Sequence, residues 1–146
     1  MIVLALIKRM EEDGVAGLRV DKNLFWEELP LQRNGKPAQG VWAVTRQGDI
    51  SQARMGKNLR ATVDIYVGFN NKLKTASVQA EILNWLFENR AICDLSGFVE
   101  GTKYEYKYEN VRIQPTTTPE NYGATENGVI VKVASALLIY DLPNEK

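Results

Sequence analysis

The chain has 146 residues, of which 45% are hydrophobic and 25% charged, and this length and composition suit one globular domain with one core. Lys and Arg number 18 and Asp and Glu number 18, and this zero net charge argues against a free-standing nucleic-acid-binding protein, which is usually basic. The chain has one cysteine, so it cannot form an internal disulfide. It has no histidine, so it lacks the most common general base and the most common transition-metal ligand.

The N-terminal segment is predicted to form a helix at residues 2–13, which ends at Gly14. Its last turn carries Glu11, Glu12 and Asp13, which oppose the helix dipole, and we interpret them as a solvated turn. The first seven residues lack the pattern of a signal peptide, and no apolar run reaches membrane-spanning length. We therefore expect a soluble protein that is made in the cytosol.

Two short strands are predicted next, at residues 24–31 and 41–46, and Pro30 favours an edge position for the first. Residues 46–60 form a predicted polar loop without apolar period. It contains one acid, Asp49, against four basic residues: Arg46, Arg54, Lys57 and Arg60. Loops of this length usually carry a function or become ordered by a partner, and a solvated surface loop is the alternative that stays open.

The centre of the chain is predicted to be a strand at residues 60–69 that leads into a helix at 75–90. In the strand, apolar side chains fall on every second position: Ala61, Val63, Ile65, Val67 and Phe69. In the helix Val78, Ile82, Trp85 and Leu86 are spaced three and four positions apart, and Leu83 and Phe87 widen this apolar stripe. A helix this apolar needs a sheet to cover, so this unit is the predicted core of the fold.

Residues 91–101 are predicted as a connector, in which Cys93 is a packing residue because no histidine is present to activate it. Residues 102–114 form a strand with Tyr104, Tyr106 and Tyr108 on one face. The apolar phase changes after them, which predicts a bulge near residues 109 and 110.

The C-terminal part contains a second long loop, at residues 115–128, and then the longest strand, at 129–142. This last strand is apolar on both faces, which predicts a central strand or one whose second face is covered by another subunit. The predicted fold is a single α+β domain with a mainly antiparallel sheet and helices packed on one face.

The sequence contains no catalytic motif. Asp64 and Glu81 are candidates for a carboxylate pair, but Asp64 alternates away from the core and is interpreted as an ordinary residue of a solvated strand face. Tyr104, Tyr106 and Tyr108 are compatible with base stacking in single-stranded nucleic acid. Because acidic residues surround them, and because tyrosine is favoured in strands and at protein interfaces, we interpret this face as a protein interface.

The order of these elements resembles that of the tail terminator, or tail completion, proteins of tailed bacteriophages and related prophages. The resemblance spans nearly the whole chain. It includes the strand that ends Asp64-Ile65-Tyr66-Val67-Gly68-Phe69, the helix at 75–90, the Pro/Thr-rich loop and the final strand with Leu138-Ile139-Tyr140-Asp141.

The resemblance implies a non-catalytic virion protein without cofactor, metal or membrane contact, located at the head-proximal end of the tail. Such proteins form a ring, commonly a hexamer, that stops polymerisation of the tail tube and offers a surface to the head–tail connector or neck protein. The loops at 46–60 and 115–128 would be arms toward the tube or neck. The candidate interface and arm residues are Arg46, Arg54, Lys57, Arg60, Tyr104, Tyr106, Tyr108 and Tyr122.

If Arg54 and Lys57 line the lumen of such a ring, they would contact passing DNA without sequence preference. Three alternatives stay open. They are a neck or head–tail connector protein, a small nucleic-acid-binding α+β domain that uses the tyrosine face, and, as the weakest, an enzyme with a carboxylate-only metal site.

Overall fold

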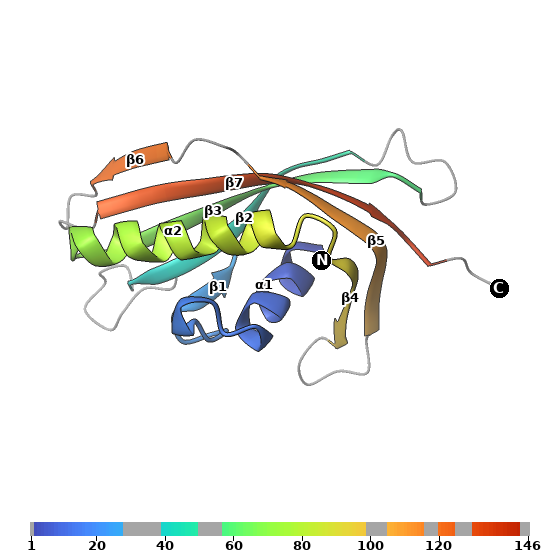
Figure 1. Ribbon diagram of the computed structural model, residues 1–146, viewed down its shortest axis with the longest axis horizontal. Helices are drawn as coiled ribbons and strands as arrows, with labels where there is room; N and C mark the ends of the chain where they lie inside the picture. The colour runs from blue at the N-terminus through green and yellow to red at the C-terminus, as the bar shows by residue number, and fades with distance from the viewer. Residues whose placement is uncertain are drawn as a thin grey trace.

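The computed structural model describes residues 2–27, 39–49, 57–98, 105–115, 120–124 and 130–143, which form a seven-stranded sheet and two helices (Figure 1). The helices are α1 (Ile2–Glu12) and α2 (Lys72–Glu88), and a short 3-10 turn, η1 (Val15–Gly17), follows α1. The strands are β1 (Leu24–Trp26), β2 (Gly40–Asp49), β3 (Leu59–Phe69), β4 (Cys93–Phe98), β5 (Glu105–Pro115), β6 (Glu120–Ala124) and β7 (Ile130–Asp141).

The strand order is β1-β2-β3-β7-β5-β4, and β6 pairs with β7. β3 and β7 form the centre and pair antiparallel from Leu59 opposite Tyr140 to Phe69 opposite Ile130. β1 is parallel to β2, and the other pairs are antiparallel. This arrangement confirms the predicted α+β class with a mainly antiparallel sheet.

Both helices cover one face of the sheet, which we call the inner face; the opposite face is the outer face (Figure 1). The inner face of β3 consists of the five residues predicted from its alternation, and all five are buried. They pack with the apolar stripes of the helices, which include Leu6, Ile7, Met10, Val78, Ile82 and Leu86. Burying this set against the sheet is the main source of stability of the fold.

α2 begins three residues earlier than predicted because Asn71 caps it. The side-chain oxygen of Asn71 accepts a hydrogen bond from the backbone N–H of Lys74 at 3.1 Å, and this satisfies a donor that the first helical turn leaves open. Thr75, the predicted first residue, is instead buried and donates its hydroxyl to the Asn71 carbonyl. The helix ends at Glu88, close to the predicted end.

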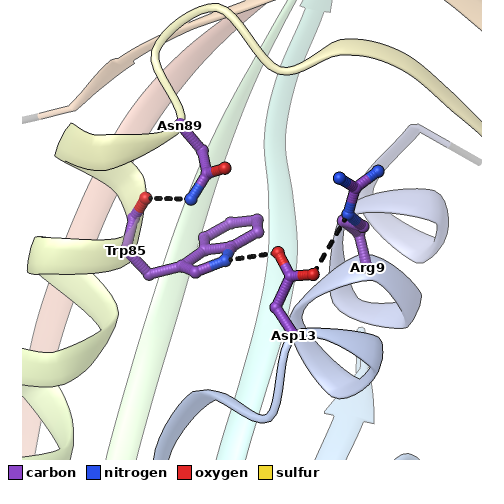
Figure 2. Close-up of polar contacts among 4 residues, drawn as sticks. All are labelled: Arg9, Asp13, Trp85 and Asn89. Carbon is purple, nitrogen blue, oxygen red and sulfur yellow. Dashed lines mark hydrogen bonds and ion pairs between the residues drawn. The ribbon is translucent and has the colours of Figure 1, made fainter.

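The acidic end of α1 is exposed at Glu12 and Asp13, as expected, but it is also hydrogen-bonded to neighbouring segments. Figure 2 shows Asp13 between the two helices, where it accepts a hydrogen bond from Trp85 Nε1 at 2.9 Å and forms an ion pair with Arg9 at 3.3 Å. Glu11 accepts a hydrogen bond from the backbone N–H of Val20 at 2.6 Å. Two of the three acids therefore fasten α1 to α2 and to the segment that follows, which offsets their unfavourable position in the helix dipole.

Three predicted loop boundaries are corrected by strand pairing. Residues 91–101 are not only a connector, because β4 forms an edge strand at 93–98. The predicted loop 46–60 is shorter, since β2 continues to Asp49 opposite Arg60. The predicted loop 115–128 contains β6 at 120–124. In each case backbone hydrogen bonds to a neighbouring strand form without the apolar alternation that sequence reasoning relied on.

Candidate interaction surface

The outer face of the sheet gathers the polar, aromatic and aliphatic side chains that alternate with the core positions. On β7 these are the odd-numbered residues, of which Val131, Val133, Ser135 and Ile139 are buried and Leu137 is partly exposed. They do not belong to the hydrophobic cluster beneath the helices. The prediction that the last strand is apolar on both faces is therefore confirmed, and its central position is confirmed with it.

An aromatic row crosses the outer face at one end. The register places Phe25 beside Trp42, Trp42 beside Tyr66 and Tyr66 beside Val133, so these residues lie in line across β1, β2, β3 and β7. The rings of Trp42 and Tyr66 are stacked, with centroids 5.3 Å apart and planes inclined by 16°. Both side chains remain partly exposed. Such a row gives the outer face a rigid apolar area with little side-chain entropy to lose on contact.

An arginine row crosses the outer face at the other end. Ile139 of β7 is the register partner of both Arg60 on β3 and Arg112 on β5. The two exposed arginines therefore flank a buried isoleucine, with backbones about 10 Å apart as expected for two strand spacings. The described part of the outer face is thus aromatic at one end and basic at the other.

Between the two rows lies a buried polar pair. Ser135 donates its hydroxyl to Asp64 Oδ1 at 2.7 Å, and both residues are 8% exposed. The interpretation of Asp64 as a solvated residue is therefore wrong, because its cross-strand neighbours Val44 and Ser135 enclose it. Glu81 is exposed on α2, on the opposite side of the sheet, so the structure does not bring this pair of carboxylates together.

A second polar cluster, which we call the Asp141 clamp, joins the start of β3, the bulge of β5 and the end of β7. The Asp141 carboxylate accepts the backbone N–H of Asn58 at 2.8 Å and the side-chain amide of Asn110 at 2.9 Å. Asn58 and Asn110 have positive φ angles of 55° and 51°, a conformation that asparagine tolerates better than most residues. The clamp therefore holds the start of β3, at the base of the β2–β3 hairpin loop, against the bulge of β5.

Hydrogen bonding determines the ionisation of this cluster. The Asn58 N–H and, after it, the Asn110 amide lower the pKa of Asp141, and the charges of Lys57 and Arg112 act in the same direction. Arg112 also donates to Asn58 Oδ1 at 3.0 Å and to the Asn110 carbonyl at 3.1 Å. The same arginine thus belongs to the clamp and to the arginine row.

The bulge predicted near residues 109 and 110 is confirmed, since the register of β5 on β7 shifts between Glu109 and Arg112. It also corrects the prediction for Tyr108. This tyrosine is 8% exposed and packs in the core with Val111, and its ring meets that of Tyr140 edge to face at 5.3 Å. Because the bulge brings Tyr108 and Val111 onto the same inner face, Tyr108 does not form part of an interface.

The other predicted interface residues lie as follows. Arg60 is exposed on the arginine row, and Lys57 lies beside the Asp141 clamp. Arg46, Tyr106 and Tyr122 lie in β2, β5 and β6, but the positions of their side chains fall outside what the structure describes, as do Arg54 and Tyr104 entirely. Sequence reasoning missed Trp42 and Arg112, although their alternation with core residues was the signal that places them outside.

Comparison of the sequence with protein-family models and with curated proteins found no match. Within the described ranges, no three His, Cys, Asp or Glu side chains are grouped as metal ligands would be. None of the described helices has the length and apolar character needed to cross a membrane.

Proposed function

We propose that this chain is a structural protein of a phage tail, which forms a ring, with a hexamer as the expected size, on the end of the tail tube. The ring stops tube polymerisation and presents a surface to the head–tail connector or neck protein. Its partners are further copies of itself, the tube protein and the connector, and its location is the head-proximal end of the virion tail. It performs no catalysis.

The observation that carries this proposal is the outer face of the central sheet. Trp42, Tyr66 and Leu137 are partly exposed there, and the carboxylate at the centre of the face is buried and hydrogen-bonded. Exposed aromatic residues with few free charges between them are typical of the core of a protein–protein interface. The order of the elements resembles that of tail terminator proteins, and for this reason we propose that the interface serves ring assembly.

The nucleic-acid alternative is weakened by Tyr108, because a tyrosine buried in the core does not stack on a base. The proposed contact of the lumen with DNA rests on Arg54 and Lys57; the first lies outside the described residues and the second lies near Asp141. Charge reversal at both positions without change in DNA affinity would remove that part of the proposal.

The test is the molar mass in solution, measured by light scattering over a concentration series, followed by addition of purified tail tubes. We expect a closed oligomer of about six subunits, and tubes whose ends are capped and no longer elongate when tube protein is added. A chain that stays monomeric and leaves tube growth unchanged would refute the proposal. Binding to isolated connector without capping of tubes would favour the neck-protein alternative.

A further inference from the structure

The charge of the exposed side chains of α2 changes along the length of the helix. Lys72 and Lys74 lie in the first turn, whereas Glu81 and Glu88 lie in the second half, and all four are exposed. Between the two lysines, Leu73 has 82% of its surface exposed. α2 therefore presents a basic and apolar start followed by an acidic end.

The side chains of the outer face also change along the same direction, from the aromatic row to the arginine row, and this order is complementary to that of α2. α2 begins directly after β3, so its start lies at the C-terminal end of that strand (Figure 1). Tyr66 and the aromatic row lie near the same end of β3. The acidic half of α2 points along the sheet in the direction in which the outer face leads to the arginine row. Lysine and leucine side chains suit an aromatic row, and glutamates suit an arginine row.

The distance between the two rows on the sheet also matches the distance between the two ends of α2. Tyr66 and Arg60 are six residues apart on one strand, which corresponds to about 20 Å. Leu73 and Glu88 are fifteen residues apart on one helix, which corresponds to about 22 Å. The start of α2 can therefore contact the aromatic row of another copy while its acidic end contacts the arginine row.

We propose that the outer face of one copy binds the exposed side of α2 on the next copy, head to tail. Leu73 contacts the aromatic row, and Glu88, with Glu81 two turns before it on the same side of the helix, pairs with Arg60 and Arg112. This inference rests on the proposed ring and deepens it by naming the two surfaces. The partner is a second copy because the two complementary surfaces lie on opposite sides of the same chain, and such a heterologous contact closes into a ring when the rotation between successive copies is a whole fraction of a turn.

A two-fold contact between two outer faces is the competing arrangement. It would leave Leu73 exposed and the glutamates of α2 without a role, and it closes after two copies. The two arrangements make different predictions for α2, because only the head-to-tail contact uses it.

The experiment uses two variants of the full chain. The sheet variant carries Arg60→Glu and Arg112→Glu, and the helix variant carries Glu81→Arg and Glu88→Arg. Each variant places like charges across the interface, so we expect the concentration for half-assembly to rise at least about tenfold for each alone. An equal mixture restores assembly, since the glutamates of one variant then meet the arginines of the other in both possible contacts.

Matched controls separate this effect from net charge and from folding. Arg19→Glu with Lys22→Glu, and Glu12→Arg with Asp94→Arg, make the same charge changes at exposed positions outside both surfaces, and they should assemble as the wild type does. Thermal unfolding is recorded for every variant. Because Arg112 also belongs to the Asp141 clamp, Arg60→Glu alone is measured as a second sheet variant that leaves the clamp intact.

The outcomes distinguish this inference from the proposed function. A wild-type oligomer that the helix variant also forms overturns the head-to-tail contact and leaves the ring proposal standing. Two variants that are each monomeric but do not assemble when mixed overturn it as well. A wild-type chain that is monomeric both in solution and with tail tubes overturns both proposals. Restored assembly in the mixture alone supports the contact.

Discussion

Removing the carboxylate of Asp141 tests the clamp that joins β3, β5 and β7. The substitution Asp141→Ala leaves the Asn58 N–H and the Asn110 amide without their acceptor. Asp141 is 8% exposed, so water replaces the lost carboxylate only in part. We therefore expect the base of the β2–β3 hairpin to lose its attachment to the end of β7.

The expected cost follows from the two hydrogen bonds. A hydrogen bond to a charged group contributes about 1.5–3 kcal/mol, and some of this is recovered when solvent reaches the freed donors. We expect the free energy of unfolding to fall by about 2–3 kcal/mol at neutral pH, which corresponds to roughly 5–10 °C in Tm for a chain of this size.

The pH dependence gives the sign of the effect. Because the pKa of Asp141 is lower in the folded protein than in the unfolded chain, its contribution is fully present above the unfolded pKa, about 3.9, and is lost as the pH falls through the folded pKa. The stability difference between the wild type and Asp141→Ala should therefore be largest near neutral pH and shrink below about pH 4. Urea unfolding at several pH values measures it.

Asp94→Ala is the matched control, because Asp94 is an exposed aspartate on the edge strand β4. It should change the free energy of unfolding by no more than about 0.5 kcal/mol. An Asp141→Ala variant as stable as this control, or a stability difference that stays constant down to about pH 2.5, would show that the clamp does not stabilise the fold through an ionised carboxylate.

Two further substitutions test local packing. In Gly40→Ala the added Cβ would lie 2.7 Å from the carbonyl oxygen of Asn23, which already accepts the N–H of Val41, so we expect a loss of about 1–3 kcal/mol in urea unfolding, and unchanged stability would contradict the close approach. Trp85→Phe removes the N–H that binds Asp13, and a double-mutant cycle with Asp13→Ala should show a coupling of about 0.5–1.5 kcal/mol, whereas strictly additive losses would mean that this bond contributes nothing.

The central strands and α2 were predictable because the spacing of their apolar residues fits only one type of secondary structure. β3 alternates over its whole length, and β7 is apolar on both faces, as expected of a central strand. β4 was not predictable because Asp94, Ser96 and Gly97 interrupt its apolar pattern; among its residues 94–96, whose burial the structure describes, Leu95 alone is buried. Edge strands of this kind depend on backbone pairing with a neighbour, which leaves little trace in the sequence.

The candidate surface shows where sequence reasoning went wrong and where information was missing. The predicted bulge already implied that Tyr108 shares a face with Val111 and Ile113, so its placement at an interface conflicted with the prediction of the bulge itself. The Asp141 clamp could not be predicted, because Asp141 and Asn58 lie 83 residues apart and meet only when β3 and β7 pair. Its one local signal is that asparagine favours positive φ.

Arg112 connects the stability of the fold with the proposed assembly. Its guanidinium donates to Asn58 and to the Asn110 carbonyl, and in the proposed contact the same group faces the glutamates of the next copy. A glutamate that pairs with Arg112 would either add to these bonds or compete with them, since the guanidinium has five N–H donors in a fixed plane.

If the glutamate adds to these bonds, assembly and the hairpin base stabilise each other, and by linkage a weaker clamp would weaken assembly by the same free energy. In the second case the clamp loosens as copies join. Substitution of Asp141, which touches neither proposed surface directly, is therefore the change whose effect on assembly separates these two cases.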